Sequence, residues 1–357
     1  MVGVTGATGH LGGQLLERLV RDPEVEEVRS VARRALVRPR GIGPGGEGSG
    51  GNSSGEASGG EGSGGEGSGG MGLARLVHTQ ADLNEPAARS ALEGVDLLYH
   101  LGAQVWQSRG AAGPLQMRTT NVEGTRNMLL ARPGAFVFAS SVSVYGAWPD
   151  NPLPMGEADK PRPNLECPYA QQKLASERAC AELAGRWAAL RLSAVLGPHA
   201  DARVARAVRA YRWAVPAVVG AGQALQWLDE GDAVEGLLAA GRSLVAGGGA
   251  DGQVLNLATA DWLGPGDMAE LAHSRVLELP RRVLVAMSEL GKQLGITPFG
   301  ADRAALIGGP LSVSAAKAHQ VLGWQPSKTS AEVLAAALER DWRGSPRNRL
   351  ISARGER

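Results

Sequence analysis

The amino-terminal stretch Val2-Gly3-Val4-Thr5-Gly6-Ala7-Thr8-Gly9-His10-Leu11-Gly12 decides the fold of this chain. Residues 2–5 are predicted to form a strand, and residues 10–21 a helix with leucine at every fourth position. Glycines three residues apart at such a junction permit a tight turn, the approach of backbone amides to a pyrophosphate, and close packing of helix on strand. The positive end of the helix dipole faces the bound anion. We therefore expect cofactor contacts from Gly6, Thr8, Gly9, His10, Leu11 and Gly12.

The end of the second predicted strand, residues 25–32, indicates which dinucleotide is bound. An NAD enzyme usually has an acidic residue there, which binds the adenosine ribose hydroxyls. This strand instead ends in Val31-Ala32-Arg33-Arg34, without an acid. Arg33 suits a 2′-phosphate, so NADP is the favoured cofactor and NAD the alternative. The other interpretation is that both arginines are solvated loop residues.

Strands and helices alternate along the first half of the chain. Further apolar strands are predicted over 73–79, 95–100 and 135–140, and helices over 87–92 and 120–131. This alternation predicts an α/β fold, a Rossmann-type doubly wound parallel sheet. After residue 190 the pattern loosens into short segments, a strand at 254–258 and helices at 281–294 and 330–340. We expect a Rossmann domain over 1–190, a smaller C-terminal substrate lobe mainly over 191–343, and a frayed tail over 344–357.

Glycine is distributed very unevenly in the sequence. Sixteen of the 51 glycines lie within residues 41–70, where Glu-Gly-Ser-Gly-Gly recurs at 47–51, 61–65 and 66–70. Such a segment buries too little apolar surface to offset its ordering entropy, so it is predicted to be a disordered insert in the first domain. Four of the 36 acidic residues lie in it, which leaves 37 basic and 32 acidic residues across the whole chain outside it.

The composition excludes several functional classes. The 37 basic and 36 acidic residues are nearly balanced, which argues against a nucleic-acid-binding surface. The longest apolar stretch, residues 213–228, is too short and too interrupted to span a bilayer, and no signal peptide is expected before the first motif. Two cysteines form no disulfide framework and lack metal-ligand spacing with histidines, so we expect no metal and a cytoplasmic location.

A candidate catalytic group lies in the segment Pro168-Tyr169-Ala170-Gln171-Gln172-Lys173. Proline suits the first turn of a helix, and Tyr169 and Lys173, four residues apart, share one helical face. A phenol has a pKa near 10 and is a poor base at neutral pH. A neighbouring ammonium group and an oxidised nicotinamide would stabilise the phenolate. Ser140 and Ser141 end a predicted central strand, where parallel sheets place their ligand sites.

Together these motifs resemble the extended short-chain dehydrogenase/reductases of the NAD-dependent epimerase/dehydratase family. The similarity extends over nearly the whole chain, and its main segments are 5–12, 81–83, 100–103, 121–125, 140–146 and 169–173. It implies that Tyr169 is the general acid/base, that Lys173 is its electrostatic partner and binds the nicotinamide ribose, and that Ser141 orients the substrate oxygen. It also implies cofactor contacts from Asp82 and Leu83 at adenine and from Gly102 and Ala103 along the ribose and phosphate. Family members often form homodimers.

Departures from the family pattern bear on the reaction. Dehydratases of the family carry an Asp-Glu pair where this chain has Val142 and Ser143, so dehydration is not expected. Nucleotide-sugar epimerases usually carry Asn and Arg where this chain has Ala194 and Leu225. We expect an NAD(P)-dependent oxidoreductase or epimerase that acts on a secondary alcohol or a ketone. The alternatives are a nucleotide-sugar epimerase proper and a non-catalytic protein that senses NAD(P).

Overall fold

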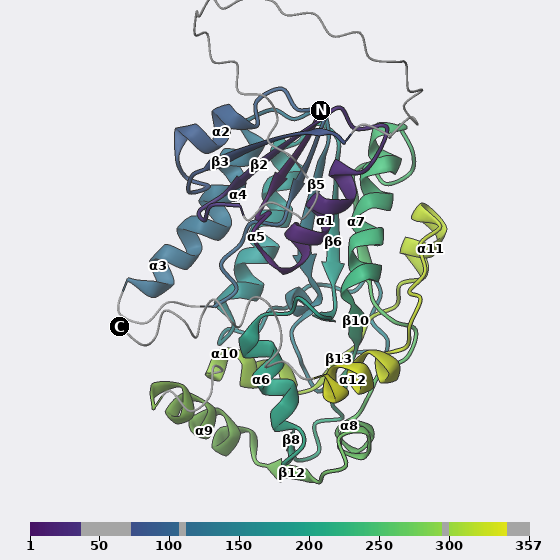
Figure 1. Cartoon of the computed structure of the whole chain (residues 1–357). Helices are drawn as coiled ribbons and strands as arrows, with labels where there is room; N and C mark the ends of the chain where they lie inside the picture. Colours follow the sequence, from purple (N-terminus) through teal and green to yellow (C-terminus); the bar gives the residue numbers. More distant parts are fainter. Residues whose placement is uncertain (37–72, 107–111, 295–299, 341–357) are drawn as a thin grey trace, which may run out of the picture.

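A computed structural model describes residues 1–36, 73–106, 112–294 and 300–340 (Figure 1). Its centre is a seven-stranded sheet of order β11-β6-β5-β4-β1-β2-β3 in which all neighbouring strands pair in parallel. The strands are β1 (Val2–Thr5), β2 (Glu27–Ala32), β3 (Arg75–Gln80), β4 (Leu97–His100), β5 (Phe136–Ser141), β6 (Trp187–Leu192) and β11 (Gln253–Leu257). The predicted doubly wound parallel sheet is therefore confirmed.

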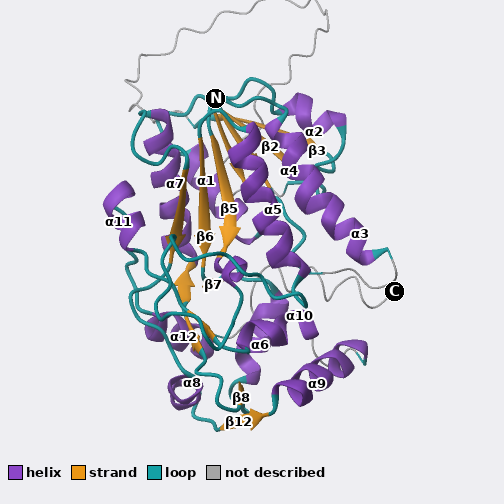
Figure 2. Ribbon diagram, turned by 180° about the vertical axis from the view of Figure 1, so that it is seen from behind, coloured by secondary structure: helices purple, strands orange, loops and turns teal. Residues whose placement is uncertain are grey.

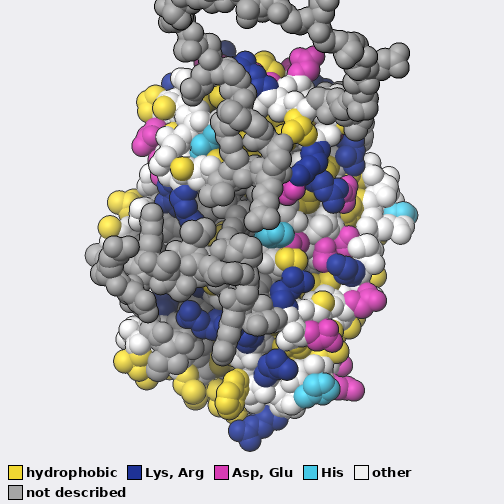
Figure 3. All heavy atoms as spheres, in the orientation of Figure 1, with side chains coloured by type: hydrophobic (Ala, Val, Ile, Leu, Met, Phe, Trp, Pro, Cys, Tyr) yellow, Lys and Arg dark blue, Asp and Glu magenta, His cyan; other side chains and the backbone are white. Residues whose placement is uncertain are grey.

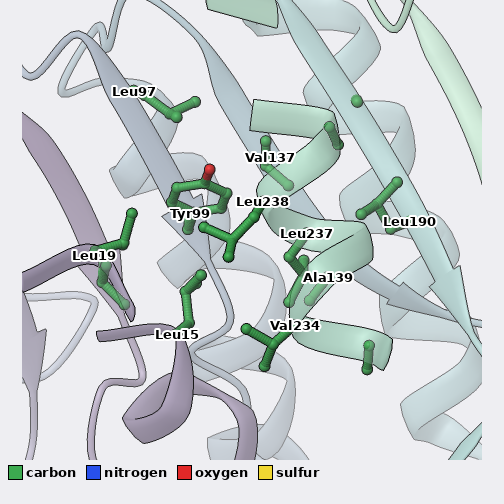
Figure 4. Close-up of a cluster of buried hydrophobic side chains, with 14 of the residues drawn as sticks. Leu15, Leu19, Leu97, Tyr99, Val137, Ala139, Leu190, Val234, Leu237 and Leu238 are labelled. Carbon is green, nitrogen blue, oxygen red and sulfur yellow. The ribbon is translucent and has the colours of Figure 1, made fainter. Parts of the chain in front are cut away.

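Side chains alternate between the two faces of this sheet, and each face has its own apolar core. On β4, Tyr99 belongs to the core that includes Leu15 of helix α1 (His10–Val20) and Leu237 of helix α7 (Glu230–Val245) (Figure 4). Its neighbour Leu98 belongs to the core on the opposite face, together with Phe138 of β5. Because both faces are buried, the central strands are continuously apolar, as parallel sheets require.

Helices cover both faces of the sheet, as Figures 1 and 2 show from opposite sides. One face is covered by α1 (His10–Val20) and α7 (Glu230–Val245), with α11 (Ala316–Leu322) beside α7. The other face is covered by α2 (Pro86–Ala91), α4 (Gly124–Leu129) and α5 (Pro168–Leu183). The segment predicted as one helix over 120–131 begins as a π-helical turn, Thr119–Glu123, that follows α3 (Gly113–Arg118).

The C-terminal lobe lies beyond the carboxyl ends of the strands, toward which the arrowheads of β5 and β6 point in Figure 2. Its three parallel strand pairs are β7–β10, β8–β12 and β9–β13. The strands are β7 (Ala194–Leu196), β8 (Val215–Val218), β9 (Ala224–Leu225), β10 (Trp227–Asp229), β12 (Val276–Leu279) and β13 (Pro310–Leu311). Its helices are α6 (Ala202–Ala210), α8 (Pro265–Leu271), α9 (Arg281–Gln293), α10 (Ala301–Ala304) and α12 (Ser330–Glu339).

The structure differs from the expected division at residue 190. The strand predicted at 254–258 was assigned to the C-terminal lobe, but β11 pairs with β6 and forms the edge of the main sheet. Helix α7 likewise packs on β4, β5 and β6. The chain thus leaves the Rossmann sheet after β6, builds part of the lobe, and returns to the sheet. Burial of the apolar residues of α7 and β11 against the central sheet accounts for this return.

The predictions of a disordered insert over 41–70 and of a frayed tail over 344–357 lie outside the described residues. Among the helices that are described, none is long and apolar enough to cross a membrane. Basic and acidic side chains are intermixed on the coloured part of the face shown in Figure 3. This mixture agrees with the balanced charge of the sequence.

Candidate active site

The glycine turn between β1 and α1 has the close backbone packing that its spacing predicts. Gly6 has a φ of +73°, and a Cβ atom there would lie 2.8 Å from the amide nitrogen of Gly102. A Cβ atom on Gly12 would overlap the carbonyl oxygen of Gly6, and the amide of Gly9 donates to that oxygen at 2.7 Å. Larger residues at Gly6 or Gly12 would push the turn apart.

The amino end of α1 suits an anion. Gly9 is its N-cap, no side chain caps the helix, and its first turn contains no acidic residue. The amide groups and the dipole of this end therefore favour a pyrophosphate. Thr8 and Leu11 are half-buried here, and Leu11 packs against the core behind the turn. These features fit the dinucleotide that the family implies.

His10 contacts the C-terminal half of the chain. Its Nε2 atom lies 2.5 Å from Oε2 of Glu230, the first residue of α7, and Nδ1 of His199 lies 2.7 Å from Oε1 of the same carboxylate. Burial opposes ionisation of Glu230, but the hydrogen bonds of the two histidines outweigh it and hold its pKa below the usual value. This bridge joins the glycine turn to the segment after β7.

The predicted adenosine contacts surround the ends of β2 and β3. Arg33 is exposed directly after β2, and its carbonyl oxygen accepts a hydrogen bond from Gln80 at 3.1 Å. Oδ1 of Asp82 accepts hydrogen bonds from the backbone and side chain of Asn84. The buried Leu83 lies against Gly102, where a Cβ atom would be 2.9 Å from Cδ1 of Leu83. The structure thus brings Leu83 against Gly102, which itself lies against Gly6.

The segment that follows β4 is held by a buried hydrogen-bond chain that sequence reasoning missed. The Gly102 amide donates to Oγ1 of Thr5 at 3.0 Å, and this hydroxyl lies 2.7 Å from Nδ1 of His100. Nε2 of His100 lies 3.0 Å from Oγ1 of Thr125. Burial lowers the pKa of His100 to about 3, so the ring is neutral and relays hydrogen bonds from Thr5 to Thr125. Ala103, half-buried, follows Gly102 in this segment.

The catalytic candidates lie where α5 meets the end of β5. Nζ of Lys173 donates to the carbonyl oxygen of Ala139 at 2.5 Å and lies 5.7 Å from the ring centre of Tyr169. Ser141 ends β5 two residues after Ala139, is half-buried, and its hydroxyl oxygen accepts hydrogen bonds from the amide and hydroxyl of Ser143. The lysine therefore ties the helix that carries Tyr169 to the strand that carries Ser141.

Burial raises the free energy of every charged form at this site. It lowers the pKa of Lys173 to about 8. It raises the pKa of Tyr169 to about 12, although the charge of Arg303 acts in the opposite direction. A phenolate at Tyr169 therefore requires cations beside it. In the described structure these cations are Lys173 and Arg303.

A second buried network fixes the position of α5. Glu177 forms an ion pair with Arg191 of β6, with 2.7 Å between Oε2 and Nη2, and each side chain is 5% exposed. The carboxylate also accepts a hydrogen bond from Ser140 at 2.5 Å. Arg191 in turn donates to the hydroxyl of Tyr145 at 2.8 Å. Losing one member of such a buried pair costs about 3–5 kcal/mol of folding stability, so α5 is held firmly on the sheet.

Asn121 lies in the π-helical turn and fixes the loop after β4. Its Oδ1 accepts from the Gln104 amide at 2.7 Å, and its Nδ2 donates to the Gln104 carbonyl at 2.9 Å and to Oε1 of Gln172 at 2.7 Å. It thereby links this loop to α5. A π-helical turn aims the side chain differently from a regular helix and is frequent at functional sites.

Arg303 of α10 is the main site residue that sequence reasoning missed. Its guanidinium carbon lies 5.4 Å from the ring centre of Tyr169 and 4.7 Å from that of Trp106. No motif marks it, because it lies more than 130 positions after Tyr169 in the sequence. Two tryptophans of the lobe lie elsewhere: Trp213 is 85% exposed, and Trp227 lies in the lobe core.

The positions that distinguish the reactions of the family carry no ionisable group. Val142 is buried, and Ser143 hydrogen-bonds to Ser141. Ala194 is exposed on β7, and Leu225 packs against apolar residues of the lobe. Within the described ranges, no three His, Cys, Asp or Glu side chains are placed to bind a metal ion.

Comparisons with known proteins agree with this architecture. The model of the NAD dependent epimerase/dehydratase family matches residues 2–258. No curated protein matches the sequence significantly.

Among solved structures, MoeE5 in complex with UDP-glucose and NAD is 24% identical, with 96% of this chain and 97% of that chain covered and a TM-score of 0.64. The UDP-glucose 4-epimerase of Thermotoga maritima with UDP-glucose is 17% identical. The similarity covers 95% of this chain and 97% of that chain, with a TM-score of 0.64. DesIV, a dTDP-glucose 4,6-dehydratase from Streptomyces venezuelae with NAD and TYD bound, is 18% identical, covers 97% of each chain, and has a TM-score of 0.65. These similarities establish the fold.

Proposed function

Because this chain belongs to the NAD-dependent epimerase/dehydratase family, we propose that it is an NAD(P)-dependent oxidoreductase or epimerase acting on a secondary alcohol or ketone. The observation that carries this proposal is the pair of half-buried Tyr169 and buried Lys173, tied through Ala139 to the strand that ends in Ser141. A half-buried phenol beside a buried ammonium group suits proton exchange with a substrate hydroxyl.

Each residue has a distinct role in the proposed reaction. A nicotinamide bound at the glycine turn would supply hydride transfer to and from the substrate carbon. Tyr169 exchanges the hydroxyl proton of the substrate, and Ser141 orients the substrate oxygen. Lys173 stabilises the phenolate, because its ammonium group lies 5.7 Å from the tyrosine ring. It also binds the nicotinamide ribose.

The glycine turn would hold the cofactor. The candidate pyrophosphate contacts are Gly6, Thr8, Gly9, His10, Leu11 and Gly12. Asp82 and Leu83 are proposed at adenine, and Gly102 and Ala103 along the ribose and phosphate. The position of Gly102 against the turn, and of Leu83 against Gly102, supports this assignment.

Substitution of Tyr169 by Phe tests the catalytic assignment. Loss of the general acid/base is expected to lower turnover by about 100-fold or more, because the phenol oxygen is removed while the ring stays in place. The measurement is NAD(P)H oxidation across a panel of carbonyl compounds. Tyr211→Phe, in the C-terminal lobe beside Trp227, removes an equivalent hydroxyl and is expected to leave turnover unchanged. Full turnover by Tyr169→Phe would refute the assignment.

We propose NADP as the preferred cofactor, with Arg33 as the residue that binds its 2′-phosphate. Support comes from its exposure directly after β2 and from the buried apolar side chains of Val31 and Ala32 at the strand end. Isothermal titration should show NADP binding about tenfold tighter than NAD, and Arg33→Ala should remove the difference. Arg178→Ala, on the exposed side of α5, is the control. Tighter binding of NAD would show that the Arg33 assignment is wrong.

The outcome of the reaction separates the remaining candidates. Val142 and Ser143 supply no acid or base for dehydration, so we do not propose it. Net reduction of a ketone consumes one NAD(P)H for each product, and net oxidation of an alcohol forms one. Epimerisation gives product with no net change in either form of the cofactor. Ala194 and Leu225 favour a substrate without a nucleotide over a nucleotide sugar. A sensor protein would bind NAD(P) and turn over nothing in the panel.

The setting of the enzyme is also a proposal. Cys167 and Cys180 are buried free thiols, which supports a reducing, cytoplasmic compartment. A homodimer formed through the helices that flank β5 is proposed on the family resemblance. Light scattering of the purified protein measures the oligomeric state directly.

A further inference from the structure

Two arginines of the C-terminal lobe alternate with two aromatic rings in a stack that ends at Tyr169. Its order is Arg203, Trp106, Arg303, Tyr169. The guanidinium carbon of Arg203, on α6, lies 5.5 Å from the ring centre of Trp106. Arg303, on α10, lies 4.7 Å from the same ring and 5.4 Å from the ring of Tyr169. Cation–π contacts of this kind hold a guanidinium plane while leaving its N–H edges available. The stack therefore orients Arg303 beside the reacting group.

Hydrogen bonding of Arg303 is incomplete among the described residues. One terminal nitrogen donates to the carbonyl oxygen of Val105 at 3.1 Å. Its Nε atom is buried without a hydrogen-bond partner in the described chain, since Oδ2 of Asp302 lies 3.9 Å away. A buried donor without a partner destabilises the fold, and the cost is larger for a charged group. Such a donor beside a catalytic residue indicates an acceptor that arrives with the substrate.

Charge at the site favours an anionic acceptor. Lys173 and Arg303 both lie near the ring of Tyr169. Arg203 is a third cation, and it lies near the ring of Trp106. Two acidic side chains lie near these cations among the described residues. Asp302 is farther from Arg303 than a hydrogen bond, and Glu177, which acts on Lys173, is already paired with Arg191. An anion that binds Arg303 would neutralise part of this charge and satisfy its Nε–H.

Resting on the proposed function, we propose that the substrate carries a carboxylate close to the reacting carbon and that Arg303 binds it. A planar guanidinium matches a carboxylate with two parallel N–H···O bonds. Because Arg303 lies on the ring of Tyr169, a group bound to it is only a few bonds from the oxygen that exchanges its proton with the phenol. The substrate class is therefore a hydroxy acid, keto acid or acidic sugar.

The experiment compares acids with matched neutral compounds on the cofactor-saturated protein. The probes are UDP-glucuronic acid against UDP-glucose, and D-glucuronate against D-glucose. Titration calorimetry is expected to show the acid of at least one pair binding about tenfold tighter than its neutral partner, because its contact is a charge-assisted hydrogen bond. Arg303→Gln should abolish this preference, and Arg303→Lys should restore part of it. Arg206→Gln, an exposed arginine of α6, should leave it unchanged.

Three outcomes would overturn the proposal. In the first, each acid and its neutral partner bind with equal affinity. In the second, neither acid binds. In the third, Arg303→Gln weakens the binding of UDP-glucose as much as the binding of UDP-glucuronic acid. The last result would mean that Arg303 binds the diphosphate. Thermal melting of each variant establishes that it is folded. Because binding is measured without turnover, a failure here is distinct from a failure of the Tyr169→Phe test.

Discussion

Burial of Lys173 sets the chemistry of the site at the scale of single residues. The side chain is 4% exposed and donates to the Ala139 carbonyl, within reach of the rings of Tyr169 and Phe138. A cation in this position is less stable than in water, which is why its pKa falls to about 8. The buried ammonium group thus places a positive charge near Tyr169, and its burial lowers the stability of the fold.

A pH dependence of stability follows from Lys173. A lysine whose pKa falls from 10.5 to about 8 on folding binds its proton less tightly in the native state than in the unfolded chain. The stability of the fold therefore rises with pH between these two values, and the penalty is fully present below pH 8. Relative to Lys173→Met, the wild-type free energy of unfolding should gain about 2 kcal/mol between about pH 7.5 and 9.5. Urea unfolding at both pH values measures it.

The control for this prediction is Lys173→Arg. Its guanidinium does not titrate in this range, so it should show the same pH dependence as Lys173→Met whatever its absolute stability. A wild-type curve parallel to both variants would show that Lys173 keeps its ordinary pKa in the folded protein.

At the scale of elements, the approach of α7 to the sheet depends on a glycine. A Cβ atom on Gly241 would overlap the hydroxyl of Tyr99 and lie 2.9 Å from Cδ2 of Leu97. The helix therefore packs directly over Tyr99 and Leu97 of β4, as the core in Figure 4 shows for the neighbouring helix residues Leu237 and Leu238. This close packing positions Glu230, at the start of α7, to reach His10.

Gly241→Ala is expected to destabilise the protein by about 1–3 kcal/mol, because the added methyl group overpacks the interface between α7 and β4. Chemical denaturation measures the change. Gly266→Ala is the matched control, since Gly266 is also helical but has no neighbour within 4 Å of a new Cβ atom. That variant should gain up to about 1 kcal/mol from helix propensity. Equal effects at both positions would contradict the packing argument.

At the scale of the whole molecule, the topology sets how short the insert can be. Strands β2 and β3 are parallel neighbours from Glu27↔Arg75 to Ala32↔Gln80. Their connection must return along the full length of a six-residue strand, about 20 Å. Ten extended residues span roughly 30 Å, which is more than sufficient.

Replacement of residues 41–70 by about ten Gly/Ser residues should leave Tm within about 3 °C of the wild type, because loop-closure entropy changes slowly with length. Direct fusion of Leu36 to Leu73 is the opposite control. It leaves six residues, 33–36 and 73–74, between β2 and β3. These cover the roughly 20 Å only when almost fully extended, so Tm should fall clearly. A large fall in Tm for the ten-residue linker would show that the insert contributes to packing.

The parts of the fold that the sequence predicted are those encoded within a few residues. The glycine turn, the alternating strands and helices, and the spacing of Tyr169 and Lys173 follow from local backbone sterics and helical periodicity. The predicted strands correspond to elements of the sheet with boundaries shifted by one or two residues. The one misplaced strand, β11, has an ordinary apolar sequence, and nothing in it indicates which sheet it joins.

The sequence by itself therefore determined the family fold, the glycine turn and the tyrosine–lysine pair. Only the tertiary structure decided that β11 completes the main sheet, that His100 relays hydrogen bonds to Thr5, and that Arg303 stacks on Tyr169. These features join residues about 60 to 135 positions apart. Such contacts depend on how whole layers of helices and strands pack, so a local sequence pattern does not predict them.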